Sequence, residues 1–195
     1  MTGRRGDTRR RIREAALTLF ADKTYGATTL QDIADEMGVT KAALYYHFHT
    51  KDEILADLVE PTIAALEAIV DRAEGQPSSP AATRELLIAM CELYAGDRRL
   101  LGILMFDRTF KAQQVLSGRS TACRTRAQRV LTHGAEGDTV AEVRAIAALA
   151  ALTVPLVALD GHDDLRPLVA PAVAAACAVL GIRPPRAPSL AMTSA

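Results

Sequence analysis

A run of side chains starting at residue 40 carries hydrogen-bond donors and no negative charge. The donors are Thr40, Lys41, Tyr45, Tyr46 and His47, with the small residue Ala42 among them. Hydroxyl, ammonium and imidazole groups bond to phosphate oxygens and to the acceptor edges of bases. The chemistry that this stretch predicts is therefore recognition of a polyanion rather than covalent catalysis.

Two short helices are expected to position these donors. The apolar residues of the segment recur every three or four positions, as on one face of a helix. We expect helices from Leu30 to Met37 and from Lys41 to about Phe48, with the turn at Gly38, where a positive φ is easy only for glycine. Their inward residues are Leu30, Ile33, Ala34, Met37, Val39, Leu44 and Phe48. This pattern predicts a helix-turn-helix motif.

The outer face of the second short helix suits the major groove of B-form DNA. A helix-turn-helix presents the start of its second helix to base edges, and Thr40 and Lys41 lie there. The methyl group of Ala42 is small enough for close approach and for contact with a thymine methyl group. His47 and Lys51 are expected to bond to phosphates. The alternative is that the tyrosines cover a small core and that Lys51 is a solvated lysine.

Positive charge gathers at the N-terminus, although the formal net charge of the 195 residues is zero. Residues 1–13 contain six arginines and one acid, Asp7. Such a basic arm is expected to reach phosphates or a minor groove, and a solvated tail is the alternative.

The run TLQDIADEMGVTKAALYYHFHTKDEIL, from Thr29 to Leu55, resembles the DNA-binding region of TetR-family transcriptional regulators. The resemblance covers about the first quarter of the chain. It implies a homodimer, operator binding by the first three helices, repression, and release of DNA when a small ligand enters a second domain. It assigns major-groove contact to Thr40, Lys41, Ala42, Tyr45 and Tyr46, and phosphate contact to Thr29, His47 and Lys51.

The rest of the chain also shows helical periodicity, and the predicted fold class is all-α. We expect further helices near residues 7–22, 51–74, 81–94, 97–106, 139–159 and 165–180, with residues 107–133 undecided. Pro61 is expected to kink the helix that contains it. The predicted domains are a helix-turn-helix DNA-binding domain (1–50), a helical ligand-binding and dimerisation domain (51–183) and a disordered tail (184–195).

The middle helices carry the apolar residues expected to line an effector cavity, for which a filled core is the alternative. They are Leu58, Ile63, Leu66, Leu86, Met90, Leu93, Leu101, Leu104, Met105, Phe106 and Phe110. The effector is therefore predicted to be small and largely apolar, and its entry is expected to move the kinked helix that follows the DNA-reading element.

The last two helices are richer in alanine and valine than one small domain needs, so two copies are expected to form a four-helix interface. The predicted interface residues are Val143, Ala147, Ala150, Val154, Val169, Ala172, Val173, Ala176 and Leu180. Burial of both helices inside one chain is the alternative. A symmetric dimer fits a palindromic double-stranded operator.

Other classes of protein have weaker signals. The segment DGHDD, Asp160 to Asp164, is the one candidate for a metal-dependent hydrolase, but too few histidines remain to complete a metal site, so no catalytic residue, metal or cofactor is predicted. Three separated cysteines indicate a reduced, cytoplasmic location, and no run of roughly 18 uncharged apolar residues indicates a membrane span. Two alternatives stay open: a DNA-binding protein without ligand response, and redox sensing by Cys123 among arginines.

Overall fold

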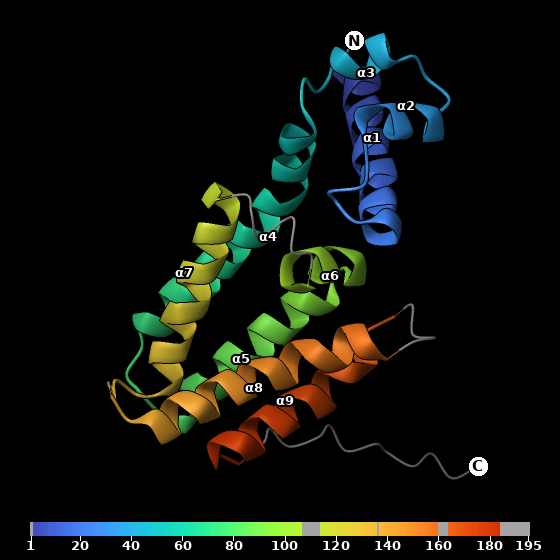
Figure 1. Cartoon of the computed structure of the whole chain (residues 1–195). Coiled ribbons are helices and arrows are strands. Elements are labelled where there is room, and N and C mark those ends of the chain that lie inside the picture. The colour runs from blue at the N-terminus through green and yellow to red at the C-terminus, as the bar shows by residue number, and fades with distance from the viewer. Residues whose placement is uncertain (1, 107–113, 136, 160–163, 184–195) are drawn as a thin grey trace, which may run out of the picture. The chain divides into compact units, whose positions relative to one another are not determined.

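The computed structural model describes residues 2–106, 114–135, 137–159 and 164–183, and every regular element in these ranges is a helix (Figure 1). The all-α prediction is therefore confirmed. The helices are α1 (Thr2–Lys23), α2 (Leu30–Glu36), α3 (Lys41–Tyr45), α4 (Lys51–Glu74), α5 (Pro80–Ala95), α6 (Arg98–Phe106), α7 (Gln114–Leu131), α8 (Thr139–Ala158) and α9 (Arg166–Leu180).

The chain divides into two compact units that do not follow the sequence in one cut. The first unit contains Met1–Ala68 and Asp97–Arg124, and the second contains Ile69–Gly96 and Thr125–Ala195. Helices α4 and α7 each contribute residues to both units. The first unit therefore includes the helix-turn-helix segment together with α6, which lies far from it in sequence.

One apolar cluster holds the first unit together. Helix α1 packs against α2 and α6, and α2 packs against α3. The side chains of Ile33, Leu44 and Phe48 are buried in this cluster with Phe20 of α1. The start of α4 and part of α6 complete it, through Ile54, Leu55, Leu58, Val59, Ile63, Ile103 and Leu104.

Helix caps and one glycine set the path of the chain through the motif. The side chain of Thr29 accepts a hydrogen bond from the amide of Asp32, and that of Thr40 accepts one from the amide of Ala43. Gly38 has φ +66°, a conformation that L side chains rarely adopt. The cap at Thr29 therefore marks where α2 begins, and the turn at Gly38 with the cap at Thr40 marks where α2 ends and α3 begins.

Most predicted helix ends lie within a few residues of the observed ones. The predicted start of α4 is confirmed by a hydrogen bond from the amide of Glu53 to Thr50 Oγ1 (3.1 Å) and one from the amide of His49 to Glu53 Oε2 (2.7 Å). Two ends differ: α1 begins at Thr2 rather than Asp7, and α3 ends at Tyr45 rather than near Phe48. Much of the undecided region, from Gln114 to Leu131, is helix α7.

Helices α5, α8 and α9 lie side by side in the second unit (Figure 1). Small residues such as Ala145, Ala148 and Ala176 are buried where these helices meet, which allows their backbones to approach closely. Among the described residues, α8 is long and apolar enough to cross a membrane by length and composition. Its contacts with α5 and α9 are those of a helix in a packed helical layer.

Candidate nucleic-acid interface

Helix α3 is anchored on one side and open on the other. Leu44 is fully buried, and Phe48, just after the helix, is 1% exposed. Thr40, Lys41 and Ala42 are exposed. The spacing of Leu44 and Phe48, four residues apart, points both toward the core and leaves the donor-bearing face in solvent.

The two tyrosines stand at the open end of that face. Tyr45 is 39% exposed and Tyr46 is 67% exposed, so the alternative that they cover the core does not hold for Tyr46. Its ring meets the half-buried His47 edge to face, with 5.3 Å between centroids. Lys41 Nζ lies 5.7 Å from the centre of the Tyr45 ring. These contacts orient the aromatic groups without covering them.

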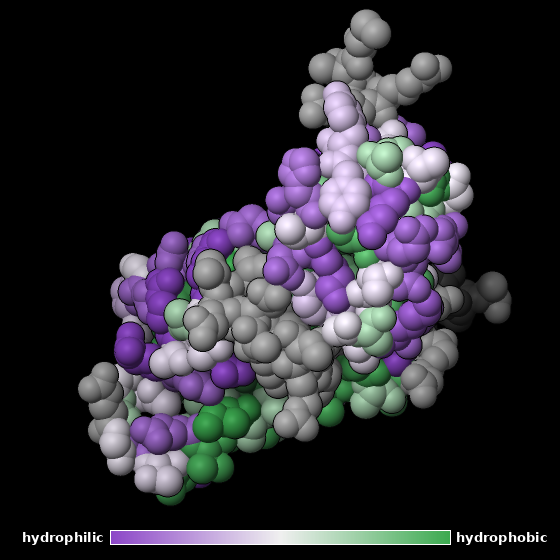
Figure 2. Space-filling model, turned by 45° about the horizontal axis from the view of Figure 1, so that its top comes forward, coloured by the Kyte–Doolittle hydropathy of each residue, from purple (hydrophilic) through white to green (hydrophobic). Residues whose placement is uncertain are grey.

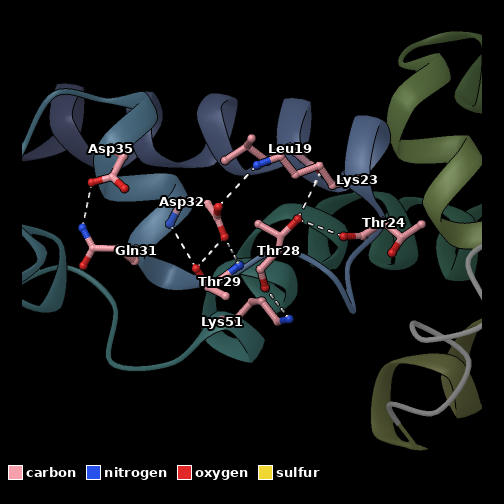
Figure 3. A network of polar contacts seen from close by, with 9 residues as sticks. All are labelled: Leu19, Lys23, Thr24, Thr28, Thr29, Gln31, Asp32, Asp35 and Lys51. Atoms are coloured by element: carbon pink, nitrogen blue, oxygen red, sulfur yellow. Dashed lines mark hydrogen bonds and ion pairs between the residues drawn. The ribbon is translucent and has the colours of Figure 1, made fainter.

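Thr29 lies at the start of α2 in a reciprocal cap with Asp32 (Figure 3). The amide of Thr29 donates to Asp32 Oδ2 (2.8 Å), and the amide of Asp32 donates to Thr29 Oγ1 (3.1 Å). Lys23 Nζ lies 3.3 Å from Asp32 Oδ1. The hydroxyl and amide of Thr29, followed by Lys23, lower the pKa of Asp32 from its ordinary value of 3.8 to about 2.

Lys51 has a different environment from the other predicted contacts. Its ammonium group donates to the carbonyl oxygens of Tyr25 (2.6 Å) and Thr28 (2.7 Å). The side chain is half-buried, so it is not the solvated lysine of the alternative interpretation. Sequence reasoning missed this site because a loop over 20 residues away in the chain supplies the acceptors.

Part of the arginine cluster holds the first unit together. The N-terminal residues form helix α1 rather than an extended arm. Arg9 donates to Asp57 Oδ1 (2.7 Å) and stacks on Phe48, 4.4 Å from the ring centre, and Arg13 Nε lies 3.4 Å from Asp57. Arg10 pairs with Asp7 within α1. Asp57, one turn and a half into α4, was not recognised as their partner from sequence.

The predicted effector residues are distributed over both units. Leu58, Ile63, Leu66, Leu101 and Leu104 are buried and Met105 half-buried in the first unit, whereas Leu86 and Met90 are buried and Leu93 half-buried in the second. The side chains of Phe106 and Phe110 lie outside the described residues. The second unit has a surface groove of about 320 Å³ between the end of α4 and α5, of which Leu86 is one wall.

The predicted dimer face needs one correction. On α8, Val143, Ala147, Ala150 and Val154 are all exposed, as a contact surface requires. On α9, Ala172, Val173 and Ala176 are buried inside the second unit itself and are not available to a partner. The α9 residues predicted from the sequence to face a partner thus lie mainly on the buried face of this helix. Of the others, Val169 and Leu180 are half-buried, and Val179, which was not predicted, is exposed.

The remaining candidate chemistry has little support. Cys123 is 2% exposed, and nearby Arg119 and Arg126 are bonded to carboxylates of α4, so this thiol is not presented to an oxidant. Residues 160–163 of the DGHDD segment lie outside the described part of the chain. Asp164 bonds to the amide of Arg166 (3.0 Å) at the start of α9.

Comparisons with known proteins agree with this geometry. Residues 12–58 match the model of the bacterial regulatory proteins of the tetR family. The biofilm operon icaADBC negative transcriptional regulator IcaR of Staphylococcus epidermidis is 46% identical over 50 residues, which are 26% of this chain and 27% of that protein. IcaR of Staphylococcus aureus strain Newman is 42% identical over 60 residues, 31% and 32% of the two chains. The chain thus aligns with only about a third or less of these relatives.

Solved structures extend the similarity of the fold to nearly the whole chain. The ketosteroid transcriptional regulator KstR2 of Mycobacterium tuberculosis superimposes with a TM-score of 0.71 at 23% identity, covering 93% of this chain and 95% of that one. A tetR-family regulatory protein from Rhodococcus RHA1 gives 0.67 at 23% identity, with 89% and 97% covered.

The fold and the exposed face of α3 define a helix-turn-helix protein with a donor-bearing second helix. Residues 12–58 are thus similar to the N-terminal segment of the tetR-family regulatory proteins, and the chain as a whole shares the fold of solved regulators.

The cap at α2 predicts an unusually acidic Asp32. Because its folded pKa is depressed, the ionised carboxylate stabilises α2 fully above its ordinary pKa of 3.8, and this stabilisation is lost as the pH falls through about 2. A carboxyl titration by NMR should place the midpoint near 2, and Thr29→Val should raise it more than Lys23→Met. A midpoint near 3.8 in the wild type would mean that the cap does not form in solution.

Proposed function

We propose that this chain is a transcriptional repressor that binds a palindromic operator as a homodimer and releases it when a small, largely apolar ligand binds. The observation that carries the proposal is the donor-bearing face of α3, which is exposed while Leu44 and Phe48 anchor the helix. The name of IcaR as a negative regulator supports repression. The proposed site of action is the cytoplasm, where the DNA is.

In the proposed complex, α3 enters the major groove with its N-terminal end at the base edges. Thr40, Lys41 and Ala42 lie at that end and are exposed, as direct readout requires. Tyr45 and Tyr46 follow one turn later, where hydroxyl groups reach the sugar-phosphate backbone or the groove. The side chains Thr29 and His47 flank the helix and are proposed to contact phosphates. Ala42 reads no polar base edge, so few side chains read the sequence directly.

A second copy of the chain supplies the second recognition helix. Val143 is 59% exposed and Ile146 is 54% exposed on α8, and apolar groups this accessible are seldom left in water along one helix face. Figure 2 shows hydrophobic side chains gathered in patches on the surface of the second unit. Pairing of these faces brings two copies together around a twofold axis, which matches the symmetry of a palindrome.

The ligand response is proposed to act through α4. This helix begins directly after the DNA-reading element and ends in the second unit, and Pro61 interrupts its hydrogen bonding. If α4 can adopt two orientations, a ligand that binds one orientation more tightly shifts the population toward it. The spacing of the two recognition helices in the dimer then changes. Differential affinity supplies the energy of this coupling, typically about 1 to 3 kcal/mol.

Substitutions on α3 should weaken DNA binding without unfolding the chain. We expect Lys41→Met and Tyr46→Ala each to cost about 1 to 3 kcal/mol of affinity for a duplex selected from a random pool. Lys41→Met should also lower the slope of log affinity against log salt by about one, because one cation fewer contacts the duplex. The control Arg124→Met removes an exposed charge from α7 and should change neither quantity. Unaltered affinity in both α3 variants would rule out this face.

A charge on the exposed face of α8 should separate the dimer. Ala150→Glu buries an unpaired carboxylate at the proposed interface, and we expect the dimer dissociation constant to rise at least about 100-fold in sedimentation equilibrium. Ala64→Glu, the same change on an exposed position of α4, is the matched control and should leave the dimer intact. An Ala150→Glu protein that remains dimeric would place the interface elsewhere.

Ligand response separates the proposed function from a DNA-binding protein without a switch. DNA selection repeated with candidate apolar metabolites should identify one that weakens binding about 5- to 150-fold. Spin labels attached to Glu36→Cys, an exposed position of α2, should report that this ligand changes the distance between the helix-turn-helix segments of the two copies. If no metabolite alters affinity or spacing, the chain is a constitutive DNA-binding protein.

A further inference from the structure

The first residue of α4, Lys51, lies over the loop that joins α1 to α2. Its Nζ is 2.6 Å from the carbonyl oxygen of Tyr25, 2.7 Å from that of Thr28 and 3.5 Å from that of Gly26. The same atom lies 4.3 Å from the centre of the Tyr25 ring, a cation-π distance. The ammonium group is therefore surrounded by acceptors of a single loop (Figure 3 shows its bond to Thr28).

This loop has acceptors that need donors from elsewhere. The side chains of Tyr25 and Thr28 are buried, and Thr24 has φ 76°, a left-handed conformation that a threonine seldom adopts. The hydroxyl of Thr28 has one proton, which it shares between the carbonyl oxygens of Thr24 (2.8 Å) and Leu19 (3.2 Å). Lys51 donates hydrogen bonds to the carbonyl oxygens of Tyr25 and Thr28. The side chains of Thr28 and Lys51 therefore supply the donors for the carbonyl groups of the loop.

A second bond joins the same two elements. The hydroxyl of Tyr25 bonds to Asp52 Oδ1, the neighbour of Lys51 in the first turn of α4. The first turn of α4 thus holds the α1–α2 loop through two adjacent residues. The loop ends at Thr29, which caps α2, so the position of the cap depends on this attachment.

We infer that Lys51 is a positioning residue for DNA recognition, which holds the α1–α2 loop and the N-terminus of α2 against the first turn of α4, and that it is not a phosphate contact. An ammonium group has three donors: two make short bonds to the carbonyl oxygens of Tyr25 and Thr28, and the third faces the carbonyl oxygen of Gly26 at 3.5 Å. A phosphate would have to take a donor from a carbonyl group of the loop, which leaves that acceptor unpaired. The inference rests on the proposed function, because it concerns how the DNA-reading unit is held.

The test compares variants in the full-length chain with a duplex selected by the wild type. We expect Lys51→Met to weaken binding about tenfold, since two carbonyl groups lose their donor, and to leave the salt slope unchanged. Lys51→Arg should be equally weak, because a planar guanidinium does not fit acceptors arranged around a compact ammonium group. Hydrogen exchange of the DNA-free variants should be faster in residues 25–36 than in the wild type.

A control separates positioning from a general loss of stability. Ile12→Val removes one buried methylene from α1 in the same unit, away from the loop, and should lower the urea midpoint while leaving DNA affinity and salt slope unchanged. All affinities are measured well below the unfolding midpoint of each variant. A loss of affinity in Ile12→Val equal to that in Lys51→Met would overturn the inference.

Two further outcomes decide the matter. A salt slope lowered by about one in Lys51→Met, with near wild-type affinity in Lys51→Arg, would identify a phosphate contact and overturn the inference while leaving the proposed function intact. A wild-type chain that selects no duplex would refute the proposed function. In that case hydrogen exchange alone tests the role of Lys51. Faster exchange of α2 in Lys51→Met would support the inference that Lys51 positions this helix, and unchanged exchange would overturn it.

Discussion

The burial of Leu44 and Phe48 is the constraint on which the exposed, donor-bearing face of α3 depends. Helix α3 has five residues, far fewer than the roughly 12 to 15 that an isolated helix needs to be even marginally stable in water. Its conformation therefore comes from packing, where each of these two side chains contributes about 1.5 to 3 kcal/mol on burial. Because both point into the core, the opposite face is free to carry Thr40, Lys41 and Tyr46 without cost to stability.

Charge in the first unit has two different uses. Arg9 and Arg13 share Asp57, and Lys51 serves loop carbonyls, so these cations fasten α1 and the α1–α2 loop to the start of α4. Lys41 stands on the exposed face and is available to an anion. A count of positive residues near the motif consequently overestimates the charge presented to DNA, because much of it is already paired. The same attachments make the beginning of α4 part of the unit that contains the helix-turn-helix, as the proposed coupling through α4 requires.

In the second unit, small residues allow the helices to pack closely. Alanines and Cys177 on the inner faces of α8 and α9 let the helices pack closely, with the thiol of Cys91 directed to the carbonyl oxygen of Leu152. Burial raises the pKa of Cys91 to about 11, so this thiol is a small apolar group and not a nucleophile. The valines on the outer face of α8 take no part in this packing and stay exposed. Contact with a second copy of the chain would remove them from water.

The sequence by itself determined the all-helical class, the helix-turn-helix with its turn at Gly38, and the donors of α3. These features follow from local rules, namely periodicity and the conformational freedom of glycine. Only the tertiary structure decided that Lys51 faces the α1–α2 loop, that Asp57 takes two arginines, that α6 belongs to the first unit, and which face of α9 is inward. Each of these depends on segments distant in the chain. On α9, alanine and valine occupy both faces, so periodicity alone does not distinguish the buried stripe from the exposed one.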